Sequence, residues 1–232
     1  MKMNIRRSND RGQADHGWLH SQHTFSFAGY RDARYMGLSR LRVINQDVVE
    51  PTRGFGTHPH RDMEILSYVV RGELEHKDTI GTGSIIRPGE VQLMSAGAGI
   101  AHSEFNPSDS NAVEFLQIWL MPSTSGGKPS YQQHDFGSDD GLVLVVSPDG
   151  RDGSLIVKQN ADVWRLFQKA EQKTELSLTR PYSWVQVVRG QLAVNGALLD
   201  AGDGLAIEGA PSLELITPAG SVRAEALIFD LP

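Results

Sequence analysis

The sequence predicts an all-β fold, and three observations support this prediction. Short runs rich in β-branched and aromatic residues recur along the chain, Gly- and Pro-containing turns separate them, and helical periodicity is almost absent. This pattern is typical of a β-sandwich or a closed barrel. The 232 residues can form one large all-β domain or two smaller ones.

The N-terminal segment, residues 1–40, combines aromatic residues with three histidines, His16, His20 and His23. Spacings of four and three residues would bring these imidazoles together only on a helix. The following Thr24–Phe27 favours loop and strand instead. We therefore expect this segment to pack against a barrel, and the three histidines to lie outside any metal site.

From Leu41 the pattern becomes continuous in short strands and turns. A polar, Gly- and Pro-containing stretch in the middle of the chain favours a division into residues 1–122, a connector at 123–154 and a second domain at 155–232. In that second domain Asn195-Gly196 predicts a two-residue hairpin turn. The expected strands are 41–44, 47–49, 57–60, 65–70, 73–78, 91–94, 114–120 and 142–146.

The second half contains a short run that is similar to one in the first half. The run Val69-Val70-Arg71-Gly72-Glu73-Leu74 recurs as Val187-Val188-Arg189-Gly190-Gln191-Leu192. Two unrelated hairpins can also produce such a match, so the sequence leaves duplication open. Under the duplication hypothesis, positions equivalent to the histidine-rich motifs described below fall near Leu176, Leu178, Leu215 and Thr217.

Composition excludes several classes of function. The net charge is −6 and no basic run occurs, which argues against a groove that binds nucleic acid by neutralising phosphates. There is no cysteine, so thiolate ligands and disulfides are excluded. No apolar run is long enough for a transmembrane helix, and the N-terminus lacks an apolar export segment. We expect no membrane association and a cytoplasmic location.

Two short motifs contain the candidate metal ligands. His58 and His60 are two residues apart, and so are His102 and Glu104 in a Gly-rich stretch. Residues two apart in a strand project from the same face, so each pair presents two donors in one direction. If the two pairs face each other across a barrel, three imidazoles and one carboxylate meet. That set suits iron, copper, zinc or nickel better than calcium or magnesium.

These residues resemble two motifs of the cupin superfamily. The first is similar to His58-x-His60-x3-Glu64, although the closing Gly72 is one residue late and the opening glycine is displaced. The second is similar to Gly99-x2-His102-x3-Asn106, with Gly97 where proline is usual. The strings Thr-His-Pro-His-Arg-Asp-Met-Glu, His-Ser-Glu-Phe-Asn and His-Thr-Phe-Ser-Phe more specifically resemble the pirin family, most strongly over residues 15–120.

The resemblance implies two cupin (double-stranded β-helix, or jelly-roll) barrels in one chain, with one divalent transition metal in the N-terminal barrel only. Its ligands would be His58, His60, His102 and Glu104. Iron is the usual metal in the family, while Cu, Ni, Mn and Zn also suit these donors. The glutamate at the position of Glu64 ligates metal in other cupins, and strand parity from His60 lets it point inward. Because pirin-like proteins take the carboxylate beside the third histidine instead, we favour Glu104 as the ligand and Glu64 as a hydrogen-bonding group near the metal.

The resemblance also implies an oxidoreductase of the quercetin 2,3-dioxygenase type, as in bacterial pirins. The substrates would be a flavonol and O2, and Glu104 would be both ligand and proton acceptor. Two alternatives remain open. One is an iron-containing redox-sensing or partner-binding regulator without turnover, as eukaryotic pirins suggest. The other is a metalloenzyme for a different small substrate, such as a sugar or keto acid.

Overall fold

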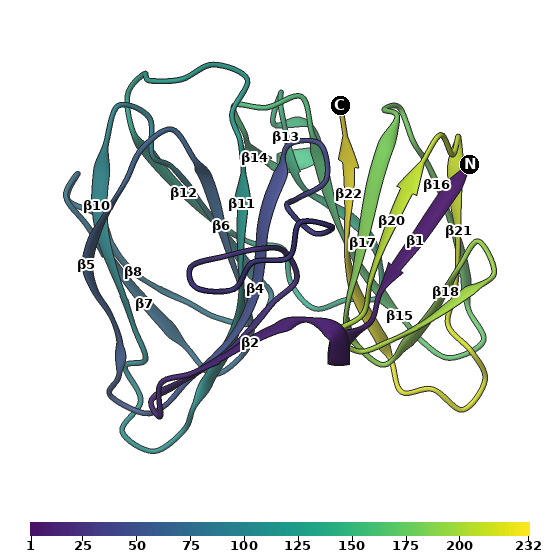
Figure 1. The fold of residues 1–232 in the computed structure, drawn as a ribbon, viewed down its shortest axis with the longest axis horizontal. Helices are drawn as coiled ribbons and strands as arrows, with labels where there is room; N and C mark the ends of the chain where they lie inside the picture. The colour runs from purple at the N-terminus through teal and green to yellow at the C-terminus, as the bar shows by residue number, and fades with distance from the viewer. The chain divides into compact units, whose positions relative to one another are not determined.

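The chain folds entirely into strands, turns and two short 3-10 helices, which confirms the all-β prediction. A computed structural model describes residues 1–232 and contains strands β1 to β22. It divides into two compact units, drawn in Figure 1. The first-barrel unit comprises residues 12–137 and 157–159, and the second-barrel unit comprises residues 1–11, 138–156 and 160–232.

The first barrel consists of two antiparallel sheets. Its strands are β2 (Gly12–Asp15), β3 (Leu19–His23), β4 (Leu41–Val49), β5 (Gly54–His60), β6 (Glu64–Arg71), β7 (Leu74–Asp78), β8 (Gly83–Ile86), β9 (Glu90–Ser95), β10 (Ile100–Phe105), β11 (Val113–Leu120) and β12 (Ser130–Asp135). A seven-stranded sheet has the order β12-β9-β6-β11-β4-β3-β2, and a four-stranded sheet has the order β5-β10-β7-β8. The strands predicted at 41–44 and 47–49 form the single strand β4.

The second barrel repeats this architecture. Its elements are β1 (Lys2–Arg6), η1 (Ser8–Asp10), β13 (Gly141–Ser147), η2 (Arg151–Gly153), β14 (Leu155–Ile156), β15 (Asp162–Gln168), β16 (Lys173–Ser177), β17 (Tyr182–Arg189), β18 (Gln191–Val194), β19 (Ala197–Asp200), β20 (Gly204–Glu208), β21 (Ser212–Ile216) and β22 (Ala224–Leu231). The sheets have the orders β1-β20-β17-β22-β15-β13-β14 and β16-β21-β18-β19. Strands β5 and β10 of the first barrel therefore correspond to β16 and β21 of the second.

The Asn195-Gly196 hairpin prediction is confirmed. Val194 pairs with Ala197 across a two-residue loop, and both loop residues have positive φ, 47° at Asn195 and 83° at Gly196. A two-residue turn with positive φ at both positions matches the twist of the flanking strands, and Asn-Gly adopts it at low steric cost.

Strand pairing places both ends of the chain in the second barrel and divides the predicted connector between the two barrels. Strand β1 pairs with β20 of the second barrel, although the sequence analysis grouped it with residues 1–122. Strand β12 pairs with β9 of the first barrel, and β13 pairs with β15 of the second. These pairings join segments far apart in the chain, so a local shift in composition carries no information about them.

The core of the second barrel is apolar where the first barrel has imidazoles. Leu176 and Leu215 are buried in its hydrophobic cluster, and Leu178 packs against that cluster. Thr217 receives a hydrogen bond of 3.1 Å from the side-chain amide of Gln168. All eight histidines of the chain lie within residues 12–137, in the first-barrel unit.

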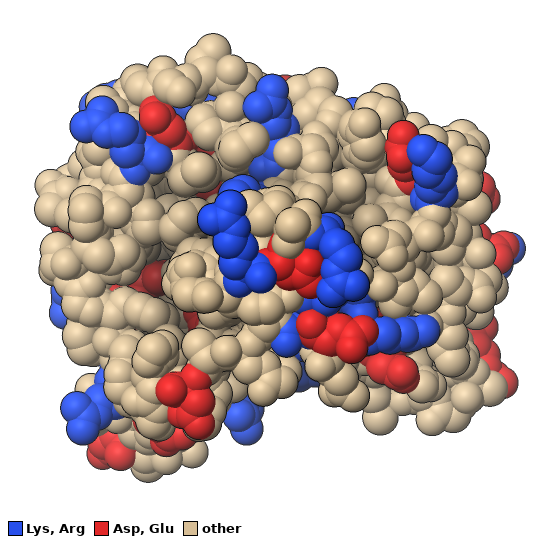
Figure 2. All heavy atoms as spheres, viewed as in Figure 1, with Lys and Arg blue, Asp and Glu red and all other residues tan.

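No helix in the structure has the length and apolar character needed to cross a membrane. On the face of the molecule shown in Figure 2, basic and acidic side chains lie beside one another in small groups, and no continuous basic patch is seen there. This pattern agrees with the net charge of −6.

Candidate metal centre and its pocket

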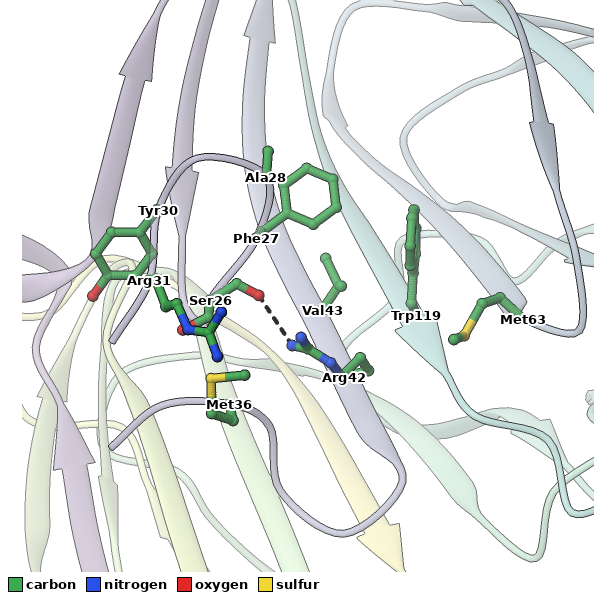
Figure 3. A pocket seen from close by; sticks show the side chains of 10 residues that line it. All are labelled: Ser26, Phe27, Ala28, Tyr30, Arg31, Met36, Arg42, Val43, Met63 and Trp119. Atoms are coloured by element: carbon green, nitrogen blue, oxygen red, sulfur yellow. Dashed lines mark hydrogen bonds between the residues drawn. The ribbon is translucent and has the colours of Figure 1, made fainter. Parts of the chain in front are cut away.

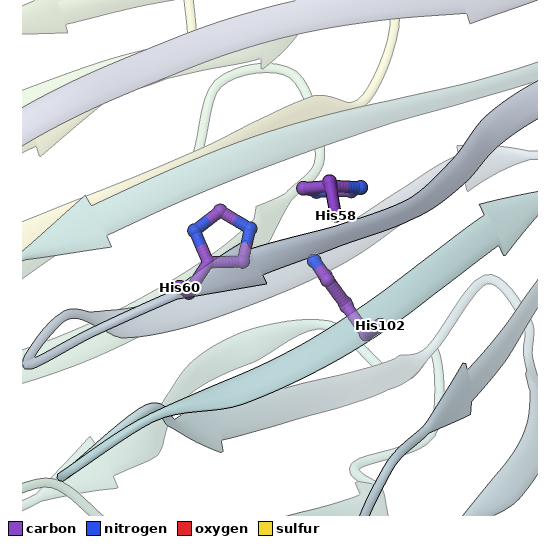
Figure 4. Close-up of side chains that lie close together, drawn as sticks. All are labelled: His58, His60 and His102. Atoms are coloured by element: carbon purple, nitrogen blue, oxygen red, sulfur yellow. The ribbon is translucent and has the colours of Figure 1, made fainter.

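The three predicted histidine ligands meet on two neighbouring strands. β5 and β10 are antiparallel partners in the four-stranded sheet, and His58 stands directly opposite His102. His60, two residues beyond His58, projects from the same face. The donor pairs therefore lie side by side, whereas the sequence analysis placed them across the barrel from each other. Figure 4 shows the three rings converging.

The triad is compact. Ring centroids are 4.8 Å apart for His58 and His60, 4.5 Å for His58 and His102, and 4.8 Å for His60 and His102. One ring nitrogen from each residue lies within 4.8 Å of the other two. Imidazole nitrogens bind zinc at about 2.0–2.1 Å, so nitrogens this close need only small movements to share one ion.

The hydrogen bonding of these rings fits metal ligation. His58 Nδ1 lies 2.8 Å from the carbonyl oxygen of Gly56, which fixes the ring proton on Nδ1 and leaves Nε2 with a free lone pair. Nε2 of His60 and Nε2 of His102 are buried without a hydrogen-bond partner. Buried polar nitrogens without partners are costly in a folded protein, and a bound cation would satisfy them. The triad forms a divalent-metal site.

The electrostatics of the site favour the neutral form of two of the triad imidazoles, those of His60 and His102. Burial, together with the neighbouring His58, lowers the pKa of His60 to about 4. Burial and the nearby His58, His60 and His76 lower the pKa of His102 to about 2. Metal binding requires unprotonated imidazole, so both rings are ready to ligate at neutral pH.

Glu104 lies beside the triad in a fully buried, polar environment. A register shift separates His102 from Glu104 on β10, and Glu104 pairs with Phe55. Its carboxylate accepts hydrogen bonds from Ser67 Oγ at 3.1 Å and Gln117 Nε2 at 2.8 Å. Burial raises its pKa to about 7.

Glu104 belongs to a second group of potential ligands that shares His102 with the triad. In this group the donor atoms of His76, His102 and Glu104 lie within 4.8 Å of one another, and all three residues are buried. The sequence analysis did not single out His76. A lone histidine 26 positions from His102 has no motif, and only the pairing of β7 with β10 brings the two together.

Glu64 is a buried hydrogen-bonding group, but its partners lie outside the triad. It accepts hydrogen bonds from Ser95 Oγ at 2.8 Å and from the backbone N–H of Lys158 at 3.1 Å. Burial raises its pKa. These contacts attach residues 157–159 to the first barrel.

A cavity of about 650 Å³ opens beside His58 and His60. Its volume lies within the range of about 300–1,000 Å³ that is typical of small-molecule sites. Aromatic and apolar side chains make up much of its lining, and a few polar groups lie among them. The lining includes Leu19, Phe27, Tyr30, Phe55 and Trp119, with Ser21, His23, Asn45, Asp47 and Gln117.

Three residues of the polar lining, His23, Asn45 and Gln117, lie in one register row across the large sheet. His23 on β3 pairs with Asn45 on β4, Asn45 pairs with Gln117 on β11, and Gln117 pairs with Ser67 on β6. Gln117 lines the cavity and also binds Glu104, so it connects the pocket with the buried carboxylate.

The N-terminal segment contributes to this pocket and not to either ligand group. His23 is buried, packs edge-to-face against Phe27 at 5.3 Å, and lines the cavity together with His16. His20 lies on β3 with its side chain 3.4 Å from Asp15. Neither group of potential ligands contains these three histidines.

A second hollow of about 390 Å³ adjoins the first, and both are lined by Phe27, Tyr30 and Trp119. Figure 3 shows the Arg42 guanidinium beside the Ser26 carbonyl, to which it donates a hydrogen bond of 3.0 Å. The segment 26–31 therefore forms part of the wall of both hollows.

Two barrels of matching topology, with a histidine triad in the first, define a metal-binding bicupin. The pirin family model matches residues 4–120, and the model of the quercetinase C-terminal cupin domain matches residues 144–231. The chain is 48% identical over 229 residues to quercetin 2,3-dioxygenase of Escherichia coli K12, covering 98% of each protein. It is 39% identical to a pirin-like protein of Caulobacter vibrioides, covering 85% of this chain and 87% of that protein.

A solved structure agrees with these similarities. Bacterial pirin YhhW from Escherichia coli, in complex with nickel(II), superposes with a TM-score of 0.95 at 45% identity, covering 100% of this chain and 99% of that one. The chain belongs to the pirin family. The predicted family and its two-cupin fold are confirmed.

Proposed function

We propose that this protein is a metal-dependent dioxygenase that cleaves flavonols such as quercetin with O2. The observation that carries the proposal is the cavity of about 650 Å³, lined largely by aromatic and apolar side chains, that borders His58 and His60 of the metal triad. The full-length similarity to an Escherichia coli quercetin 2,3-dioxygenase supports the same reaction.

The proposed ligands are His58, His60, His102 and Glu104. The three imidazoles are already grouped, and Glu104 and His102 have potential ligand atoms within 4.8 Å of each other. Iron is the proposed metal, and nickel is a reasonable probe because a pirin of 45% identity was solved with nickel(II). A bound divalent metal would act as a Lewis acid that offers open coordination positions to adjacent oxygens of the substrate.

The chain contributes three further functions. The aromatic walls of the cavity, including Phe55 and Trp119, bind the flat rings of a flavonol and limit the access of water to the reacting carbons. Asn45 and Asp47 present polar atoms to its hydroxyl groups. Glu104 accepts the proton of the 3-hydroxyl, because it is the carboxylate beside the triad and Gln117 connects it with the cavity.

The overall reaction inserts both atoms of O2 into the flavonol, opens its central ring and releases carbon monoxide. A regulator that only binds a partner needs no cavity beside its metal, so the open pocket favours turnover. The proposed partners are accordingly a flavonol and O2. The cytoplasmic location stays a prediction from the sequence.

The test is oxygen consumption by anaerobically iron-loaded protein across a series of flavonols, with carbon monoxide measured in parallel. We expect equal consumption of oxygen and flavonol, and release of carbon monoxide, only with metal-loaded protein. If loaded protein consumes no oxygen with any flavonol, the dioxygenase proposal is wrong and the metal-dependent binding module takes its place.

A further inference from the structure

The third histidine of the triad has a buried hydrogen-bonded chain behind it. His102 Nδ1 lies 3.3 Å from His76 Nδ1, and His76 Nε2 lies 3.1 Å from Asp78 Oδ2. The side chains of His76 and Asp78 are 0% exposed. The three residues lie on two paired strands, β7 and β10.

The chemistry of these groups fixes where each ring proton lies. An ionised carboxylate only accepts hydrogen bonds, so His76 carries its proton on Nε2 and donates it to Asp78. His76 Nδ1 then has a free lone pair, and only a proton on His102 Nδ1 can complete the contact between the two rings. This leaves the lone pair of His102 on Nε2, the buried nitrogen that has no hydrogen-bond partner.

We propose that Asp78 and His76 are positioning residues that hold His102 in the tautomer with Nε2 free to ligate the metal. The inference rests on the metal site of the proposed function and is independent of its substrate. In many metal sites a carboxylate accepts a hydrogen bond directly from a ligating histidine and so fixes its tautomer. Here a second imidazole, that of His76, lies between the carboxylate of Asp78 and the ligating histidine and fixes the tautomer in the same way.

The surroundings hold the chain in this arrangement. Asp78 Oδ1 accepts the backbone N–H groups of Ile80 at 3.0 Å and Thr82 at 2.9 Å, so Oδ2 is the oxygen left for His76. The ring of Tyr131 packs on that of His76 with centroids 4.8 Å apart, which limits rotation of the imidazole.

A second cation shared by His76, His102 and Glu104 is the competing arrangement, since their donor atoms also lie within 4.8 Å of one another. It would require His102 to offer lone pairs from both ring nitrogens while the triad is occupied. An imidazole does this only after losing its last ring proton. The hydrogen-bonded chain, or relay, needs no such loss and leaves both rings, those of His76 and His102, with one ring proton each.

Asp78→Asn is the sharpest test, because the turn dictates how the amide is oriented. The amide oxygen takes the place of Oδ1 opposite the two backbone N–H groups, and the NH2 group faces His76 Nε2. His76 must then carry its proton on Nδ1, and His102 must move its own proton to Nε2. The substitution inverts the relay without a change of shape.

The measurements are nickel(II) affinity by chelator competition and the ring tautomer of His102 by long-range 1H–15N NMR of metal-free protein. We expect an Nδ1–H tautomer in the wild type and an Nε2–H tautomer in Asp78→Asn, with nickel affinity lower by roughly 10–100-fold. Asp135→Asn removes a carboxylate at the exposed end of β12, where it accepts the backbone N–H of Gly137 at 2.8 Å, and should leave both unchanged.

A second pair of variants keeps the inference testable if Asp78→Asn does not fold. His76→Gln retains an acceptor and a donor and should keep affinity closer to that of the wild type than His76→Phe, which retains neither. An Nε2–H tautomer of His102 in the wild type, or equal nickel affinity in these variants, would overturn the relay. So would two nickel equivalents per wild-type chain with the second lost in His76→Phe. None of these readouts uses a flavonol, so failure of the dioxygenase proposal is recorded separately.

Discussion

His58 and His102 stand directly opposite each other on β5 and β10, with ring centroids 4.5 Å apart. Directly opposed residues of an antiparallel pair project from the same face, so the pairing alone brings the two imidazoles together. The register shift that follows His102 gives Glu104 the partner Phe55 and leaves its carboxylate bonded to Ser67 and Gln117. The same strand, β10, therefore carries one imidazole of the triad and, after a register shift, the hydrogen-bonded carboxylate beside it.

His60→Ala should abolish metal retention and oxygen uptake, because it leaves only two imidazoles of the triad. The measurement is metal content after gel filtration, together with the melting temperature to check folding. His134→Ala is the matched control, since His134 is an exposed histidine of the same barrel on β12. Full metal content in His60→Ala would contradict the triad assignment.

Purified, loaded protein should contain one metal equivalent per chain. The core positions of the second barrel are occupied by residues such as Leu176 and Leu215, which offer no donor atom. Elemental analysis checks this number, and His60→Ala should remove the whole equivalent. A second equivalent that persists in His60→Ala and disappears on substitution in the second barrel would refute the prediction.

Asp47 should make the metal-free protein less stable as pH rises. Burial raises its pKa to about 7 from an ordinary value of 3.8, although the Ser21 hydroxyl donates to it. The folded state then holds a proton that the unfolded state releases. Its contribution to stability is present below about pH 4 and is lost as pH rises through about 7.

Urea denaturation of wild type and Asp47→Asn between pH 4 and 8 checks this sign. The free energy of unfolding of Asp47→Asn should decline less over that interval, because its amide cannot ionise. Asp109→Asn, at an exposed position of the same barrel, should follow the wild-type curve. A wild-type curve parallel to that of Asp47→Asn would show that the carboxyl is not held protonated.

Gly12→Ala should destabilise the first barrel by about 1–3 kcal/mol, the usual cost of overpacking. A Cβ at Gly12 would lie 2.3 Å from the ring of Tyr30, which also lines both hollows. Gly29→Ala is the control, since a Cβ there meets nothing within 4 Å. Removal of the ring in the double variant Gly12→Ala/Tyr30→Ala should relieve the clash, and a double-mutant cycle in urea measures that coupling.

Local patterns predicted the strands and the histidine motifs, because both arise from neighbouring residues. The i, i+2 spacing of His58 and His60 places them on one face of a strand in any register, and Asn195-Gly196 dictates its own turn. The sequence could not show that β5 and β10 are adjacent, since that depends on how distant segments pair. The triad was therefore predicted with the right residues in the wrong spatial relationship.

The residues that sequence reasoning missed are single members of strands. His76 is brought beside His102 only by the pairing of β7 with β10. Asn45 and Gln117 become neighbours only through the pairing of β4 with β11. Each looks like an ordinary polar residue in its own segment. Strand β1 is a similar case, because its partner β20 lies at the other end of the chain.

Glu104→Gln should separate the holding of metal from the transfer of a proton. The new amide can keep its oxygen toward Gln117 and turn its NH2 group toward Ser67, whose hydroxyl also accepts hydrogen bonds. The fold should therefore persist, and the three histidines should still retain metal. An amide cannot take up the proton of a flavonol hydroxyl, so we expect turnover to fall by about 10²–10⁴-fold.

Metal content, melting temperature and oxygen uptake with quercetin distinguish the outcomes for this variant. Retained metal with greatly reduced turnover supports Glu104 as the base. Loss of metal together with turnover would make Glu104 essential as a ligand and leave the base to another group. Turnover within twofold of the wild type would exclude both roles, because neither an indispensable ligand nor the proton acceptor can be replaced by an amide without a loss of rate.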